Sequence, residues 1–234
     1  MFITDMSKRI FIPTASADDW KSFLAEPEKQ WRAGFSARTL ALCWESANGF
    51  PAEVESVFIN SGITAFQKID LLLGFPEYKV YLPPLNGRPS QNDLLVVAKD
   101  SDDELVTIAV EGKVAEPFGP TLSEWNPTES QGKTIRFEFL QNLLGLKEIP
   151  SSIRYQLLHR SASAILEAKR FNAKSAIMLL HSFSPEMLWL DDFQAFVNLF
   201  EVHAEPGKLY FLKDIGDIHF YVAWVKGNEK FLVE

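Results

Sequence analysis

The chain has 234 residues, 47% of them hydrophobic and 23% charged, which is enough to bury the core of a single globular domain. Its net charge of -8 argues against a nucleic-acid enzyme, because polyanion binding depends on phosphate neutralisation by Lys and Arg. An acidic chain that binds nucleic acid therefore needs a local basic stripe or a partner that supplies one. Apolar runs fall short of the ~18–20 residues that span a bilayer, and the N-terminus lacks a signal peptide's apolar core, so we expect a cytoplasmic protein without membrane contact.

The first part of the chain is predicted to be helical. Residues 1–35 are interpreted as an N-terminal extension, and a helix is expected from Ser36 to the Asn-Gly-Phe-Pro stop that begins at residue 48. Glu45 falls in the last turn of this helix, where the helix dipole disfavours an anion and a nearby cation would stabilise it. Cys43 is the only cysteine and is interpreted as a core residue. A second helical stretch is expected over about residues 51–73.

Two apolar, β-prone runs at residues 94–98 and 105–110 predict a β-hairpin, with turn-forming residues between them. A first strand is expected just before this hairpin, over residues 78–82. If the turn is centred on Asp102, Asp93 falls directly opposite Glu111, with Cα atoms ~4.5–5.5 Å apart. Because side chains alternate along a strand, Glu111 and Lys113 then share one face while Gly112 points away from it.

Facing carboxylates are unfavourable in a sheet unless a proton or a cation neutralises them. A hard divalent ion such as Mg²⁺ or Mn²⁺ fits Asp93 and Glu111, since it favours oxygen ligands and retains waters. Lys113 would then contact a phosphate oxygen or position an attacking water. The alternative is structural, with Asp93 as a turn residue before a strand and Glu111 with Lys113 as the solvated end of another.

The second half of the chain continues the alternation of helices and strands. Helices are expected over about 130–144 and 151–170, a buried strand over 176–180, an amphipathic helix over 186–200, and a hairpin of 208–212 with 218–225. On the first of these helices the predicted core positions are Ile135, Phe139, Leu143 and Leu144. On the second, polar side chains form a surface that could face the carboxylates: Tyr155, Gln156, His159 and Arg160.

With these residues placed, the chain resembles the PD-(D/E)XK nuclease superfamily, whose restriction-endonuclease-like core is a helix, three antiparallel strands, a helix and a further strand. Asp93 matches the acid at the start of the second strand, and Glu111 with Lys113 matches the E-x-K at the end of the third. Asn92 stands in place of the proline that gives the family its name. The resemblance covers roughly residues 36–182 and implies an α/β fold with a central mixed sheet.

The resemblance also implies roles for further residues. Glu45 is similar to the first-helix acid that joins the metal site in many members, and Gln156 to the second-helix polar residue of several branches. The implied catalytic set is Asp93, Glu111, Lys113, Glu45 and Gln156, with Asp93, Glu111 and Glu45 as ligands of Mg²⁺ or Mn²⁺ and with Arg160, Tyr155 and His159 near the substrate. We expect a single domain over 36–234, with residues 183–234 as a C-terminal extension of the sheet.

Two functions follow from different classes. The first is a metal-dependent nuclease that hydrolyses phosphodiester bonds of DNA or RNA, with the aromatic helix near the C-terminus offering an interface for a homodimer. The second is a non-catalytic binding protein on a nuclease-like scaffold, of the kind found in defence or toxin systems, whose acidic surface would dock a basic partner.

Overall fold

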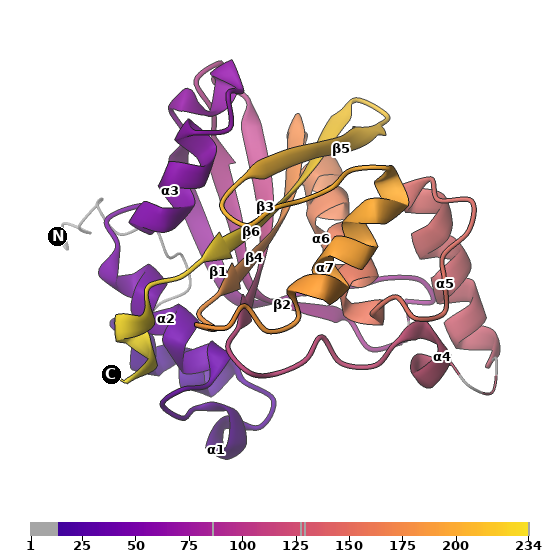
Figure 1. The fold of residues 1–234 in the computed structure, drawn as a ribbon, viewed down its shortest axis with the longest axis horizontal. Helices are drawn as coiled ribbons and strands as arrows, with labels where there is room; N and C mark the ends of the chain where they lie inside the picture. The colour runs from indigo at the N-terminus through magenta and orange to yellow at the C-terminus, as the bar shows by residue number, and fades with distance from the viewer. Residues whose placement is uncertain (1–13, 86, 127, 129, 234) are drawn as a thin grey trace, which may run out of the picture.

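A six-stranded mixed sheet forms the centre of the molecule in this computed structural model, which describes residues 14–233 apart from 86, 127 and 129. Helices cover both faces of the sheet (Figure 1). This arrangement confirms the predicted mixed α/β class. Within the described residues, no helix is both long and apolar enough to cross a membrane.

The strands lie in the order β1-β2-β3-β4-β6-β5. Their bounds are Asp70–Val80 (β1), Ser90–Lys99 (β2), Leu105–Lys113 (β3), Ser175–Ser182 (β4), Leu209–Ile215 (β5) and Ile218–Lys226 (β6). β4 runs parallel to both β3 and β6, and the other neighbouring pairs are antiparallel. The long crossover from β3 to β4 carries most of the helices that cover one face, as a parallel connection requires.

The helices divide into two groups by the sheet face on which they pack (Figure 1). One face carries α2 (Ser36–Ser46) and α3 (Ala52–Ile59), together with the 3-10 helix Ala17–Phe23 and α1 (Pro27–Gln30). The other carries α5 (Gln131–Leu144), α6 (Tyr155–Phe171) and α7 (Leu190–Val197), with α4 (Leu122–Trp125) at its margin. Two hydrophobic cores therefore enclose the sheet, and β3 and β4 are buried on both sides.

The predicted β2–β3 hairpin is confirmed, with the register centred on Asp102. Leu94 pairs with Val110 and Lys99 with Leu105. The apolar run of β4 is a central buried strand, as predicted. The order of the predicted core, helix then three antiparallel strands then helix then strand, is present from α2 to β4.

Three predicted elements are wrong in part. The helical stretch expected over 51–73 ends at Ile59, and β1 begins at Asp70, eight residues before the expected strand. On α5 the buried positions are Arg136, Leu140 and Leu144, whereas Ile135 is exposed. The buried face of α5 therefore differs from the predicted one. It includes Arg136, whose guanidinium donates to carbonyl oxygens in the loop of residues 82–88.

Candidate active site

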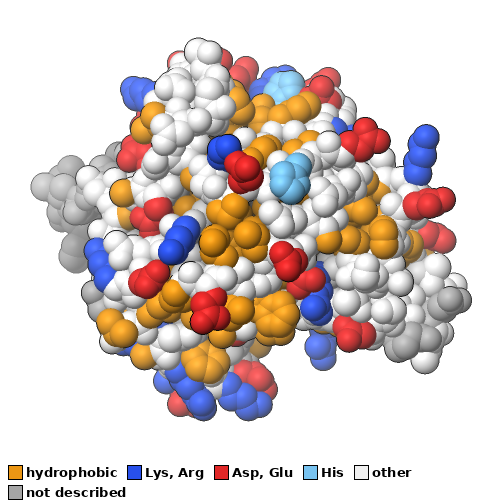
Figure 2. Space-filling view, viewed as in Figure 1, with side chains coloured by type: hydrophobic (Ala, Val, Ile, Leu, Met, Phe, Trp, Pro, Cys, Tyr) orange, Lys and Arg blue, Asp and Glu red, His pale blue; other side chains and the backbone are white. Residues whose placement is uncertain are grey.

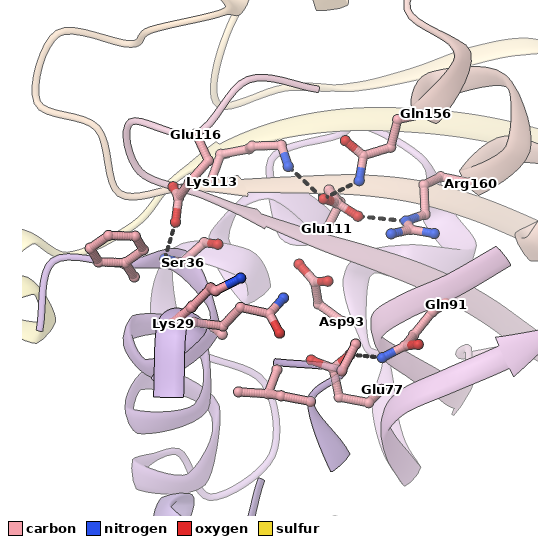
Figure 3. Close-up of a pocket in the computed structure, with 15 residues that line it drawn as sticks. Lys29, Ser36, Glu77, Gln91, Asp93, Glu111, Lys113, Glu116, Gln156 and Arg160 are labelled. Carbon is pink, nitrogen blue, oxygen red and sulfur yellow. Dashed lines mark hydrogen bonds and ion pairs between the residues drawn. The ribbon is translucent and has the colours of Figure 1, made fainter. Parts of the chain in front are cut away.

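A pocket of about 460 Å³ lies at the end of the sheet where β2 and β3 carry the predicted acidic residues. Asp93, Glu111 and Lys113 line it, and Gln156 enters from the first turn of α6. Figure 3 shows these side chains converging on a common space. The structure thus brings together four of the five residues predicted as catalytic.

Three carboxylates form a row across neighbouring strands. The pairs on either side of Glu77 place it opposite Asp93 on β2. The continuing register of β2 against β3 places Asp93 opposite Glu111. In Figure 3, Asp93 lies between the other two acids. Glu77 adopts the left-handed backbone conformation, with φ at 52°. Residues other than glycine rarely adopt this conformation, and proteins keep it mainly at functional sites or where the surrounding structure enforces it.

Glu111 is neutralised by the protein itself. Lys113 Nζ lies 2.5 Å from Oε1, Gln156 Nε2 donates to the same oxygen at 2.7 Å, and Arg160 Nε donates to Oε2 at 2.5 Å. Burial favours the neutral acid, but Arg160 and Lys113 outweigh it and lower the pKa of Glu111. This carboxylate is therefore ionised near neutral pH and held in a fixed orientation.

Asp93 and Glu77 lack such an ion pair in the described structure. Asp93 Oδ2 accepts the Gly112 N–H at 2.8 Å, and Glu77 Oε2 accepts the Gln91 amide at 2.6 Å. Burial and then the charge of Glu111 raise the pKa of Asp93 to about 7. Burial and then the charge of Asp93 raise the pKa of Glu77 to about 8. Asp93 and Glu77 therefore retain protons that ordinary carboxyl groups lose near pH 4.

Gly112 allows the close approach of the acid to the strand backbone. A Cβ at this position would lie 3.3 Å from Leu40 side-chain atoms and 3.4 Å from Asp93 Oδ2. A side chain here would press on α2 from one side and on the carboxylate from the other. The glycine of the E-G-K triplet thus keeps its N–H accessible to Asp93.

The structure does not bring Glu45 into this pocket. The pocket meets α2 at its start, where Ser36 and Ala37 line it. Glu45 sits near the other end, ~13 Å along the axis at 1.5 Å per residue. There its Oε1 accepts from Trp20 Nε1 at 2.9 Å. Glu45 therefore fastens the 3-10 helix of residues 17–23 to α2, and the third carboxylate of the row is Glu77.

Arg160 lines the pocket as predicted, but Tyr155 and His159 lie beside it rather than in its lining. Tyr155 stacks on Trp125, with ring centroids 3.9 Å apart and planes 10° apart. His159 Nδ1 lies 2.8 Å from Ser90 Oγ, which also accepts from Arg160 at 3.0 Å. Burial and then Arg160 keep the pKa of His159 well below its ordinary value, so a neutral imidazole helps to position Arg160.

A second cluster of potential ligands, Cys43, Glu53 and His181, lies on the other face of the sheet, with ligand atoms within 4.8 Å of one another. Trp44 Nε1 donates to His181 Nδ1 at 3.1 Å. An indole nitrogen can only donate, so Nδ1 holds the lone pair and Nε2 carries the proton. Nε2 lies 3.3 Å from Glu53 Oε1.

The Cys43 thiol donates to the same Glu53 oxygen at 3.5 Å, and burial raises its pKa far above the ordinary range. The histidine tautomer and the protonated thiol both fit a cluster of polar side chains around Glu53. Cys43 is buried in the core, as predicted.

Glu77 was not among the predicted site residues because the predicted first strand began at residue 78, one residue after this glutamate. Pro76 and the preceding Gly74-Phe75 read as a turn, and Pro weakens a strand prediction. The available signal was the spacing to the hairpin: a strand extended back through Glu77 presents a third acid in the row of Asp93 and Glu111. The resemblance implies that Arg160 lies near the substrate; in the structure its guanidinium forms an ion pair with Glu111.

Comparison with known proteins gives a family and no function. Residues 13–229 match the family described as Domain of unknown function (DUF6946), so the chain belongs to that family. No curated protein and no solved structure matches the chain.

Proposed function

We propose that this member of the DUF6946 family is a divalent-metal-dependent phosphodiesterase that hydrolyses nucleic acid. The row of Glu77, Asp93 and Glu111 with Lys113 at its end carries the proposal. The resemblance to the PD-(D/E)XK nucleases supports it, since the acid, the E-x-K and the helix-borne Gln156 occur in the order and on the elements that the resemblance implies.

The donor set fits a hard cation. Three carboxylates in one row repel one another, and a divalent ion relieves this repulsion without requiring protons. Glu111 accepts three hydrogen bonds in the structure, and a carboxylate offers about four acceptor sites, so one is left for a shared ligand. Asp93, Glu77 and Glu111 would hold Mg²⁺ or Mn²⁺. When bound, such an ion supplies Lewis-acid stabilisation of charge on phosphate oxygens.

The side chains around the row have distinct tasks. In hydrolysis a water oxygen attacks phosphorus while the bond to the leaving oxygen breaks, and the leaving oxygen takes up a proton. Lys113 stabilises the negative charge that develops on the phosphoryl oxygens, and Gln156 and Arg160 keep Glu111 oriented. The low exposure of Lys113, at 4%, strengthens this electrostatic contribution because little water screens it.

One observation favours the non-catalytic alternative. Lys113 and Arg160 already balance Glu111, so the site has part of its neutralisation without a metal. A binding protein would retain this arrangement as a buried ion-pair network. It would then bind Mg²⁺ or Mn²⁺ no more weakly after its row is altered than before.

The test compares Asp93→Asn and Lys113→Ala with Asp103→Asn, an exposed residue in the turn of the same hairpin. Labelled DNA and RNA oligonucleotides are incubated with Mg²⁺ or Mn²⁺, and folding is checked by circular dichroism. We expect cleavage to fall about 100-fold or more in the first two variants and to stay unchanged in the third. Cleavage that survives Asp93→Asn and Lys113→Ala in folded protein would reject the assignment.

A further inference from the structure

We infer that the pocket takes single-stranded nucleic acid, one unstacked nucleotide at a time, and excludes an intact duplex. This inference rests on the proposed phosphodiesterase function and specifies its substrate class. Three features of the pocket carry it: its size and walls, its charge balance, and an exposed aromatic side chain in its lining.

The pocket is sized for a single small unit. Its volume of about 460 Å³ lies in the range of ~300–1,000 Å³ that is usual for small-ligand sites, which suits one nucleotide. Residues from the N-terminal segment close its outer side: Leu24, Ala25, Lys29, Gln30 and Phe35. In Figure 3, Lys29 faces the acids across the cavity.

This outer wall is built into the fold. Trp20 is buried and donates to Glu45, which fastens the N-terminal segment to α2. At the other end of the wall, the backbone N–H of Ser36 donates to Glu116 Oε1 at 2.8 Å, and Val114 donates to the second oxygen at 3.1 Å. Glu116 thus ties the start of α2 to the segment that leaves β3. These attachments hold the N-terminal segment beside the acids, where it lines the approach to Asp93.

The charge of the pocket suits one phosphodiester group. Its described lining contains four carboxylates and three cations: Glu77, Asp93, Glu111 and Glu116 with Lys29, Lys113 and Arg160. With every group ionised the lining has a net charge of -1, and one divalent ion changes this to +1. A duplex needs many phosphate contacts, yet Figure 2 shows Lys and Arg interspersed with Asp and Glu on the visible face.

Phe35 offers the surface on which a base would stack. Its side chain is 39% exposed, lines the pocket and immediately precedes the anchored residue Ser36. Proteins that bind single strands place successive bases on such aromatic faces, and the stacking tolerates any sequence. A paired base has its faces covered by its neighbours in the duplex, so this contact selects unpaired nucleotides.

The experiment uses the full chain with Mg²⁺ and labelled DNA and RNA oligonucleotides of one sequence, each offered as a single strand and annealed to its complement. Phe35→Ala and the conservative Phe35→Tyr are compared with Phe211→Ala, which removes a similarly exposed ring from β5 at the far edge of the sheet. KM and kcat are measured separately.

We expect the wild type to cleave the single strand at least about 10-fold faster than the duplex. Loss of stacking in Phe35→Ala should raise KM about 5- to 100-fold with kcat little changed, while Phe35→Tyr and Phe211→Ala behave as wild type. Equal cleavage of the duplex, or an equal KM in Phe35→Ala and Phe211→Ala, would overturn the inference and leave the phosphodiesterase in place. Failure of the wild type to cleave either form would overturn both.

Discussion

Replacing Glu77 by Gln should stabilise the metal-free protein above pH 7 and change it little near pH 4.5. Glutamine has the shape of the protonated acid and keeps an oxygen for the Gln91 amide, but it carries no charge. The pKa of Glu77 is raised from 4.5 to about 8 in the folded chain, by burial and then by Asp93. The folded state therefore binds this proton more tightly than the unfolded state does.

The sign of the pH effect follows from that difference. At pH values below 4.5 the Glu77 carboxyl is protonated in both the folded and the unfolded state, so its titration does not change the free energy of unfolding. Between pH 4.5 and about 8 the unfolded chain has released the proton while the folded chain retains it, so stability falls as pH rises. Each unit of pKa difference corresponds to about 1.4 kcal/mol.

Partial solvation of Glu77 reduces the destabilisation that its ionisation causes. We therefore expect the free energy of unfolding of Glu77→Gln to exceed that of the wild type by about 2–4 kcal/mol at pH 8. For a chain of this length that corresponds to a rise in Tm of about 5–10 °C.

The assay is thermal unfolding in EDTA at pH 4.5 and pH 8, followed by circular dichroism. Glu138→Gln is the matched control, since Glu138 is an exposed glutamate on α5. A Tm difference between Glu77→Gln and wild type that is the same at both pH values would refute the reasoning, because it would show that Glu77 does not retain its proton. Added Mg²⁺ should then raise the Tm of the wild type at pH 8 more than that of Glu77→Gln.

Three further predictions test other parts of the site. Glu45→Gln should leave metal-dependent cleavage within about 2-fold of wild type, and a loss above 10-fold would contradict its placement at the far end of α2. Arg160→Met removes one cation from buried Glu111 and should cost about 3–5 kcal/mol in urea unfolding, whereas a cost below 1 kcal/mol would show that the pair is dispensable. Trp44→Phe leaves His181 Nδ1 without its donor and should cost about 1–3 kcal/mol in the same assay; added Zn²⁺ should not restore it.

The register of the hairpin was predictable because local chemistry determines it. The acidic turn between two apolar runs fixes the centre of symmetry at Asp102, and the opposition of Asp93 and Glu111 follows by counting. The position of Glu45 was not predictable in this way. Periodicity indicates that a helix exists but not which of its ends approaches the sheet, since that depends on packing between distant segments.

Arg136 illustrates a second limit. Hydropathy assigned α5 a buried face that includes Ile135, yet the structure buries Arg136 at 7% exposure. Its guanidinium satisfies the carbonyl groups of Leu82, Pro83 and Arg88, which a turning loop leaves without strand partners. The need for such a donor arises only when the loop and the helix meet, so the sequence of α5 alone carries no sign of it.

The charge distribution within the row changes the initial hypothesis about the metal. That hypothesis placed an ion between Asp93 and Glu111 with Lys113 alongside. Glu111 instead has two cationic partners of its own and a lowered pKa, whereas Asp93 and Glu77 have raised pKa values. A divalent ion gains most where negative charge is least compensated. The ion would therefore be held mainly by Asp93 and Glu77, and Glu111 would serve to fix Lys113 beside the phosphate.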